Sequence, residues 1–237
     1  MGTLFVVGTP IGNLEDISLR ALRVLKEVDV ILCEDTRVTK RLLEKYEIKD
    51  KQLFAYNEQK SGIKIEKVIE LLKEGKNVAL VSDAGTPGIS DPGAKLVSLI
   101  VEKFRSYDPK LKTSELQNFP TIVSVPGPSA LTAALSISGI PSDNFLFLGF
   151  LPHKKGRETL FKEISESKRP VVFYESPHRI IKTLESLGKF EPQKSITTCR
   201  ELTKVYEEVK SGTPQELLEY YKTRPEKIRG EFVVIVV

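Results

Sequence analysis

Short apolar runs alternate with amphipathic stretches in the first half of the chain, and this alternation constrains the fold more than any other feature. Strands are expected at 4–7, 28–33, 52–56, 77–81 and 121–125. Helices are expected at 18–27, 36–46, 63–74 and 93–104. Parallel strands need a long crossover connection, which is usually a helix. The pattern therefore predicts βαβ units that build a parallel sheet.

A second alternation begins near Asn144. Its expected strands are 145–150, 170–175, 195–199 and 232–237, and 205–210 is an ambiguous further strand. Its expected helices are 157–165, 177–187 and 214–222, preceded by a small-residue helix at 129–138. Between the two alternations, the aperiodic polar stretch 105–120 indicates a surface excursion. We predict two α/β domains, 1–125 and 126–237.

Composition excludes several classes of protein. Hydrophobic residues make up 40% of the chain and charged residues 29%, as in a soluble globular protein. No apolar run reaches membrane-spanning length, and the N-terminus lacks the pattern of a signal peptide. Cys33 and Cys199 lack a CxxC spacing, which favours reduced thiols over a disulfide or metal site. We therefore predict a cytoplasmic protein without a membrane segment.

The first loop with chemical interest is Gly8-Thr9-Pro10-Ile11-Gly12, directly after the first predicted strand. Glycine permits close approach of the backbone to a ligand, and proline stiffens the turn. Glu34 and Asp35 lie where a dinucleotide fold places its ribose-binding acid, but the G-x-G-x-x-G fingerprint is absent. A purely structural strand-to-helix turn is the alternative interpretation.

The second loop follows the buried run 78–81 and reads SDAGTPGISDPG at 82–93. Three glycines, two prolines and two aspartates indicate a long, stiff loop that exposes its backbone. Such a loop is costly to order unless it holds something. For Asp91, a capping role and a ligand role are equally favoured.

Two further strand ends carry polar or small residues. The sequence VPGPSA at 125–130 places small residues at a helix start, where an anion or a closely packed helix would fit. The sequence YESPHR at 174–179 ends a strand in polar residues and opens a helix with proline, leaving His178 and Arg179 at its exposed start. His153 is the other histidine of the chain, and no ligand spacing is present, so we predict no metal.

Taken together, these loops resemble a known family. GTPIGNLED at 8–16, EDTR at 34–37 and the loop 82–93 are similar to the tetrapyrrole-methylase-like superfamily, and within it to the 16S rRNA cytidine-2′-O-methyltransferases. The stretches 125–130, 149–152, 174–179, 200–204 and 230–236 extend the resemblance over nearly the whole chain. The stretch 104–119 is longer than this branch leads us to expect, and the chain ends at Val237, where other members carry a tail.

The resemblance implies two α/β domains with a cofactor cleft between them, S-adenosylmethionine as cofactor, and a homodimer. It also implies that the first two loops and the start of the 129–138 helix hold the methionine part, with strand ends of the C-terminal domain around the adenosine. The cofactor-binding residues implied are Thr9, Pro10, Gly12, Ser82, Asp83, Ala84, Gly85, Thr86, Ile89, Ser90, Asp91, Ser129, Ala130, Leu151 and Tyr174.

A ribose 2′-hydroxyl becomes a good nucleophile only when a positioned group accepts its proton. The candidate catalytic residues for this step are Glu34, Asp35, Glu175 and His178. Arg37 is expected to hold a substrate phosphate, with Arg179 as its reserve. An equally favoured interpretation makes Glu34, Asp35 and Arg37 a structural cap and ion pair.

The substrate that the resemblance implies is a cytidine of small-subunit ribosomal RNA, in a largely assembled particle. The net charge of +4 is too small to establish RNA binding by itself. Three basic groups are candidates for phosphate contacts: Arg37, Lys40 and Arg41; Lys154, Lys155 and Arg157; and Lys222, Arg224, Lys227 and Arg229. The rival functions are methylation of a tetrapyrrole or another small molecule, RNA binding without catalysis, and nicotinamide-dependent oxidation.

Overall fold

The structure is a computed structural model that describes residues 1–56, 63–106, 120–153 and 156–237. Most of the unusually long stretch 104–119 lies outside these ranges. The chain divides into two compact units, Met1–Ser129 and Ala130–Val237. Each unit has its own sheet and its own core, as two α/β domains require.

The first unit contains a five-stranded sheet in the order β3-β2-β4-β1-β5. Every neighbouring pair in it is parallel, which confirms the predicted βαβ architecture. Its strands are β1 (Thr3–Val7), β2 (Val30–Cys33), β3 (Gln52–Ala55), β4 (Val78–Leu80) and β5 (Thr121–Val125). Its helices are η1 (Leu14–Asp16), α1 (Leu19–Glu27), α2 (Thr36–Lys45), α3 (Ile65–Lys73) and α4 (Gly93–Ser106).

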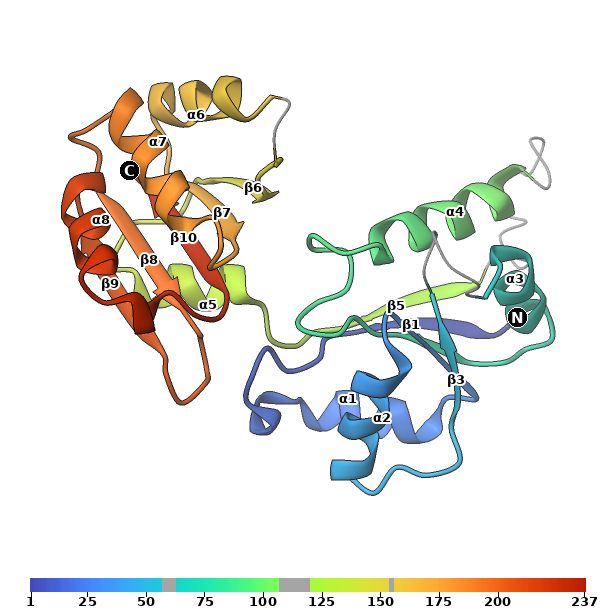
Figure 1. Cartoon of the computed structure of the whole chain (residues 1–237). Helices are drawn as coiled ribbons and strands as arrows, with labels where there is room; N and C mark the ends of the chain where they lie inside the picture. The colour runs from blue at the N-terminus through green and yellow to red at the C-terminus, as the bar shows by residue number, and fades with distance from the viewer. Residues whose placement is uncertain (57–62, 107–119, 154–155) are drawn as a thin grey trace. The chain divides into compact units, whose positions relative to one another are not determined.

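Helices cover both faces of this sheet, because its strands carry apolar residues on both faces. On one face, α1 and α2 bury residues such as Leu25 and Leu43 against Ile31 of β2. On the other face, α3 and α4 bury residues such as Leu72 and Ile100 against neighbouring strand residues. Figure 1 shows α1 and α2 on one side of the sheet and α4 on the other.

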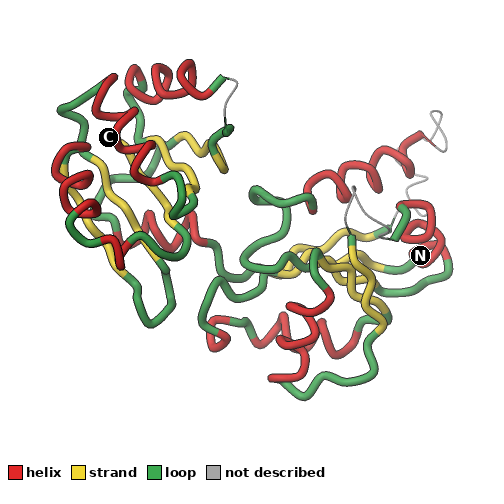
Figure 2. Tube along the Cα trace, in the orientation of Figure 1, coloured by secondary structure: helices red, strands yellow, loops and turns green. Residues whose placement is uncertain are grey.

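The strand order places a ligand-binding position at the carboxyl ends of β1 and β4. These two strands are neighbours, but β1 leads to α1 on one face while β4 leads to α4 on the other. Open α/β sheets bind ligands at such a switch in direction. The loop from β4 to α4, which has no regular secondary structure in Figure 2, begins at this point.

The second unit has a mixed sheet in the order β6-β7-β10-β8-β9. Here β6 and β7 are parallel, while β10 runs antiparallel to both β7 and β8. Its strands are β6 (Leu146–Phe150), β7 (Val171–Glu175), β8 (Ile196–Arg200), β9 (Glu208–Gly212) and β10 (Phe232–Val236). Its helices are α5 (Ala130–Ile137), α6 (Arg157–Glu166), α7 (Ile180–Phe190), α8 (Pro214–Lys222) and η3 (Pro225–Lys227).

One face of the mixed sheet packs against α6, α7 and α8. Phe161, Leu184 and Tyr221 from these helices join Val171 and Phe173 of β7 in the core. The parallel pair β6 and β7 ends at the same edge of the sheet. The residues that follow the two strands are therefore neighbours in space.

Several element boundaries differ from those expected, three of them at the following places. Val28 is the C-cap of α1, so β2 begins only at Val30. The helix expected from Pro177 begins at Ile180, because residues 177–179 form a turn. The ambiguous strand is β9, Glu208–Gly212, and the preceding residues Val205 and Tyr206 lie exposed in a loop.

We predict that Gly8→Ala destabilises the first unit. A Cβ at Gly8 would lie 2.8 Å from Cα of Gly127, a backbone atom that cannot rotate away. Overpacking of this kind costs about 1–3 kcal/mol in the free energy of unfolding. Urea denaturation measures this change. The exposed control Ser124→Ala should stay within about 0.5 kcal/mol of the wild type, and an equally stable Gly8→Ala protein would contradict the close approach.

Candidate functional site

The loops after β1 and β4 are joined at Thr9 and Gly85. Thr9 N donates to Gly85 O at 2.9 Å, and Gly85 N donates to Thr9 O at 3.1 Å. The buried hydroxyl of Thr9 also donates to the carbonyl of Ser82, at 3.1 Å. Two loops that are far apart in sequence thus form one rigid surface at the switch position of the sheet.

Carboxylates from β2 and β4 meet beside this junction. Asp35 N donates to Asp83 Oδ1 at 3.0 Å, and Asp83 N donates to Glu34 Oε1 at 3.3 Å. The structure therefore brings together three residues that the sequence analysis assigned to catalysis or cofactor binding. Their acidic side chains concentrate negative charge at one end of the sheet.

The loop 82–93 is stiffened from within. Asp91 accepts hydrogen bonds from Gly88 N and from Gly93 N, at 2.8 Å and 2.6 Å. The bond from Gly93, the first residue of α4, agrees with the capping role, and the ligand role of Asp91 stays a prediction. Gly85 and Gly88 have φ values of +83° and +93°, which favour glycine strongly. Ala84 and Ile89 stay exposed on this loop.

The three carboxylates differ in their proton affinity. Burial raises the pKa of Glu34, and repulsion from Asp83 and Asp91 acts in the same direction. Partial burial also raises the pKa of Asp83. In contrast, the hydrogen bonds from Arg37 lower the pKa of Asp35 to about 2. Because a proton acceptor must be basic, Glu34 and Asp83 suit that role better than Asp35.

Asp35 and Arg37 form the cap and ion pair of the structural interpretation. Asp35 is the N-cap of α2 and accepts from Arg37 N at 2.8 Å. The Arg37 guanidinium contacts both oxygens of Asp35, and 84% of its side chain is exposed. An exposed guanidinium can still reach a phosphate, so that role of Arg37 stays a prediction.

A pocket of about 260 Å³ opens next to the junction, within the first unit. Its walls are mainly apolar, and its polar groups come from the loops after β1 and β4 and from α2. The lining residues are Thr9, Pro10, Leu14, Val38, Thr39, Arg41, Leu42, Ser82 and Asp83. Gly12 lies on the exposed turn that follows Pro10.

The segment after β5 lies against the same loops. Gly127 packs on Gly8, and Thr86 Oγ1 donates to Pro128 O at 3.0 Å. These contacts fix the backbone that leads to Ser129 and Ala130. Both residues are half-buried, and α5 begins at Ala130.

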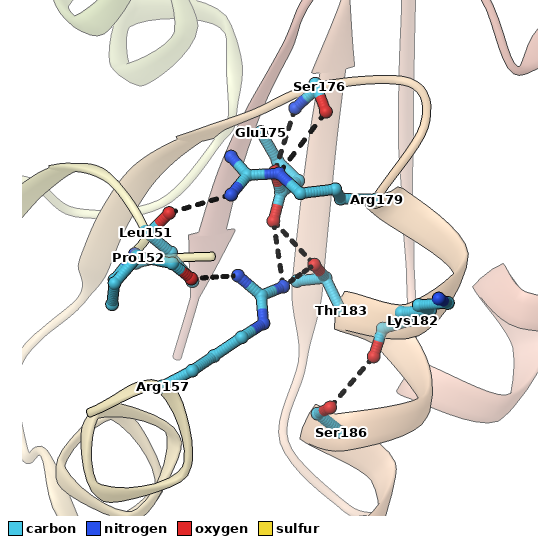
Figure 3. A network of polar contacts seen from close by, with 9 residues as sticks. All are labelled: Leu151, Pro152, Arg157, Glu175, Ser176, Arg179, Lys182, Thr183 and Ser186. Atoms are coloured by element: carbon cyan, nitrogen blue, oxygen red, sulfur yellow. Dashed lines mark hydrogen bonds and ion pairs between the residues drawn. The ribbon is translucent and has the colours of Figure 1, made fainter. Parts of the chain in front are cut away.

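In the second unit, Glu175 lies at the centre of a buried polar network (Figure 3). Its oxygens accept from Arg179 Nε at 2.6 Å and from Arg157 Nη2 at 3.1 Å. Thr183 Oγ1 and Ser176 N donate to it as well, at 2.6 Å and 2.9 Å. Because its side chain is fully buried and both oxygens are occupied, Glu175 is not available to accept a substrate proton.

The same network changes the roles of two arginines. The side chains of Arg157 and Arg179 are only 14% and 16% exposed, and both are paired with Glu175. The sequence predicts Arg179 at an exposed helix start and Arg157 in a basic group that contacts RNA phosphates. Both expectations are wrong for these side chains, because the buried carboxylate draws them inward.

The remaining candidates of the second unit lie near this network. Leu151 is buried directly after β6. The Tyr174 ring makes edge contacts with Phe147 and Phe150, at centroid distances of 5.1 Å and 5.3 Å. His178 is exposed in the turn before α7. The roles of Leu151, Tyr174 and His178 stay predictions.

Sequence reasoning missed Thr183 and the inward role of Arg157. A signal for Thr183 was present, because it shares the helix face of Ile180, Leu184 and Leu187, all of them buried. A polar residue at a core position needs a partner, and here the partner is Glu175. Arg157 gave no such signal, because it opens α6 beside solvent-exposed positions.

The basic groups have few free cations in the ranges that the structure describes. Lys154 and Lys155 lie outside these ranges. Lys40 approaches Glu44, while Lys222 and Lys227 pair with Glu185 and Glu208. Arg224 lies over the Tyr220 ring, whereas Arg41 and Arg229 are exposed. A role of these groups in RNA binding stays a prediction.

The described residues contain no group of three or more histidine, cysteine, aspartate or glutamate side chains that could hold a metal ion. Nor does any helix among them have the length and apolar character needed to cross a membrane. The expectation of a metal-independent protein stays a prediction.

Comparison with known proteins places the whole chain among methylases. A family model described as Tetrapyrrole (Corrin/Porphyrin) Methylases matches residues 3–218. A Thermotoga maritima protein named Ribosomal RNA small subunit methyltransferase I is 44% identical over 236 residues, which cover 100% of this chain and 98% of that protein. The protein of the same name from Bacillus subtilis is 42% identical to this chain. The matched region covers 100% of this chain and 75% of that protein.

Solved structures confirm the fold. Diphthine synthase matches with a TM-score of 0.68 at 15% identity, covering 100% of this chain and 90% of that one. The methyltransferase CobJ matches with a TM-score of 0.65 at 19% identity, covering 100% of this chain and 94% of that one. A uroporphyrin-III C-methyltransferase from Thermus thermophilus, complexed with S-adenyl homocysteine, matches with a TM-score of 0.63 at 17% identity. The match covers 99% of this chain and 92% of that one.

We predict that Glu34→Gln stabilises the fold near neutral pH. A raised pKa means that ionisation of Glu34 costs the folded state free energy, and this cost is present above the folded pKa and disappears as pH falls through it. Glutamine stays neutral and still accepts from Asp83 N. Thermal unfolding should therefore show a higher Tm for the variant at neutral pH and a smaller difference at about pH 4.

The matched control for this prediction is Asp35→Asn. The pKa of Asp35 is lowered in the folded state, so its charge stabilises the fold at every pH above the pKa that Asp35 has in the unfolded chain. This stabilisation is lost as the pH falls toward about 2. The control should lower the Tm slightly at neutral pH, opposite in sign to Glu34→Gln. A Glu34→Gln protein with an unchanged or lower Tm at neutral pH would contradict the burial of this charge.

Proposed function

The chain belongs to the tetrapyrrole (corrin/porphyrin) methylase family, and from this membership we propose that it transfers a methyl group from S-adenosylmethionine to small-subunit ribosomal RNA. The observation that carries the proposal is the 44% identity, over almost its full length, to a protein named Ribosomal RNA small subunit methyltransferase I. We assign the acceptor more narrowly as the 2′-hydroxyl of a cytidine, in agreement with the motifs at 8–16, 34–37 and 82–93.

The residues of the first unit suit the methionine end of the cofactor. Bound S-adenosylmethionine would supply an electrophilic methyl group on a positively charged sulfur. The exposed residues Asp83 and Ala84 present a carboxylate and backbone for a cation. Gly85 keeps side-chain bulk away from that backbone. The residues present therefore fit the cofactor.

Glu34 is the best-placed proton acceptor among the candidates in the first unit. Its raised pKa makes it a stronger base than Asp35, and Asp83 N–H orients one of its oxygens. A base acts efficiently when its pKa approaches the working pH. Arg37, with its exposed guanidinium, would hold the substrate phosphate. Glu175 leaves the proposed catalytic set because its oxygens are occupied.

We also propose a cytoplasmic homodimer that acts on a largely assembled small subunit. The support for this part is the resemblance to the ribosomal RNA methyltransferase branch. Methylation of a tetrapyrrole is the alternative outcome, since the solved relatives of similar fold include a uroporphyrin-III C-methyltransferase. That likeness, at 17% identity, is far weaker than the likeness to the ribosomal RNA methyltransferases.

We predict that Asp83→Ala combined with Gly85→Val abolishes binding of S-adenosylhomocysteine. Valine is strained at the φ of +83°, and its Cβ would lie 3.4 Å from the side chain of Ile11. Titration calorimetry measures the binding, with one site per chain expected for the wild type. Gly75→Val is the matched control, because Gly75 has the same φ and open space around it. Unchanged affinity in the double variant would place the pocket elsewhere.

The activity itself is tested with small ribosomal subunits from cells that lack the gene. Purified protein and labelled S-adenosylmethionine are added, and mass spectrometry maps the modified nucleotide. We expect label on the ribose of a cytidine, and strongly reduced transfer with Glu34→Gln although that variant binds the cofactor. Label on a base, on a tetrapyrrole precursor offered in parallel, or on nothing would refute the assignment.

A further inference from the structure

The segment that follows β6 depends on two guanidinium groups for its position. Arg179 Nη1 donates to Leu151 O at 2.8 Å, and Arg157 Nη1 donates to Pro152 O at 3.0 Å. Figure 3 shows both contacts side by side. Movement of either arginine would therefore take a hydrogen bond away from this segment.

Both arginines are in turn oriented by one carboxylate. Glu175 Oε1 accepts from Arg179, and Oε2 accepts from Arg157. Thr183 completes the arrangement, because its hydroxyl donates to Glu175 and accepts from Arg157 Nη2 at 2.6 Å. We call these four residues the Glu175 cluster. It links the end of β7, the first turns of α7, and the start of α6 to the segment after β6.

Packing alone does not require a carboxylate at this position. Glu175 continues the buried face of Val171 and Phe173 on β7, where an apolar side chain would fill the core without desolvating a charge. Replacing a buried ion pair by apolar residues is often neutral or stabilising. What an apolar side chain cannot do is orient two guanidinium groups toward neighbouring carbonyls. Orientation of the segment is thus the distinctive consequence of the cluster.

We propose that Glu175, Arg157, Arg179 and Thr183 are positioning residues that fix the segment Leu151–Pro152 for cofactor binding. This inference rests on the proposed function, and on the resemblance, which implies that Leu151 and Tyr174 bind S-adenosylmethionine. The neighbouring Tyr174 points to the other face of β7 and packs on Phe147 and Phe150 of β6. Strand β7 therefore contacts β6 through the Tyr174 ring, and it orients the segment after β6 through the Glu175 carboxylate and its two arginines.

Thr183→Val tests the cluster against a matched control. Valine preserves the side-chain shape but removes the hydroxyl that holds Arg157 and Glu175. Thr198→Val does the same to another fully buried threonine of this unit, whose hydroxyl pairs with Tyr221 Oη at 2.7 Å. Thr198 makes no contact with the cluster among the described residues. Calorimetry with S-adenosylhomocysteine and thermal unfolding are measured for both.

We expect Thr183→Val to raise the dissociation constant of S-adenosylhomocysteine by roughly tenfold, the scale of one lost hydrogen bond to a charged group. Thr198→Val should lower the Tm without changing that constant. Thr183→Ser restores a hydroxyl and should recover most of the affinity. If Thr183→Val does not fold, Arg157→Lys replaces it, since lysine keeps a cation beside Glu175 but loses the fork that reaches Pro152 O.

The remaining outcomes overturn the proposal. Wild-type affinity in Thr183→Val or Arg157→Lys would show that the cluster does not position the cofactor segment. Equal weakening by Thr183→Val and Thr198→Val would assign the effect to stability of the whole unit. A wild-type chain that binds no S-adenosylhomocysteine would remove the proposed function as well, and this result is distinct from a failure confined to the variants.

Discussion

The reciprocal hydrogen bonds between Thr9 and Gly85 are the constraint on which the site of the first unit depends. They join the loop after β1 to the loop after β4, at the position where the crossover helices leave the sheet on opposite faces. The glycine at 85 supplies the positive φ of this pairing. Together with the contacts of Asp83 and Thr86, the junction holds the loop 82–93 in place.

Electrostatics at this junction favour function over stability. Burial raises the pKa of both Glu34 and Asp83; repulsion from Asp83 adds to the rise at Glu34, and repulsion from Asp35 adds to the rise at Asp83. A fold selected for stability alone would not retain such a pair. The neighbouring Asp35 shows the opposite case, because its ion pair with Arg37 and its capping role favour the charged form. Adjacent carboxylates in the chain thus have different chemistry.

Much of the architecture was predictable because local periodicity and crossover rules act within short stretches. The parallel sheet and its helices follow from the apolar runs, whereas the hydrogen bonds that join loops 8–13 and 82–93 were seen only in the structure. The mixed direction of the second sheet did not follow, because β10 pairs with strands distant in sequence. Burial of Arg157, Arg179 and Glu175 was also unpredictable, since each looks like a surface residue until the fold brings them together.

The central proposal is that the cofactor binds at the junction of the loops after β1 and β4, in the first unit. Hydrogen–deuterium exchange of the whole chain, with and without S-adenosylhomocysteine, tests it most directly because the experiment reports on every peptide at once. The account predicts protection in peptides that cover 8–13 and 82–93, with little change in those that cover β9 and α8. Protection confined to other peptides would contradict the account.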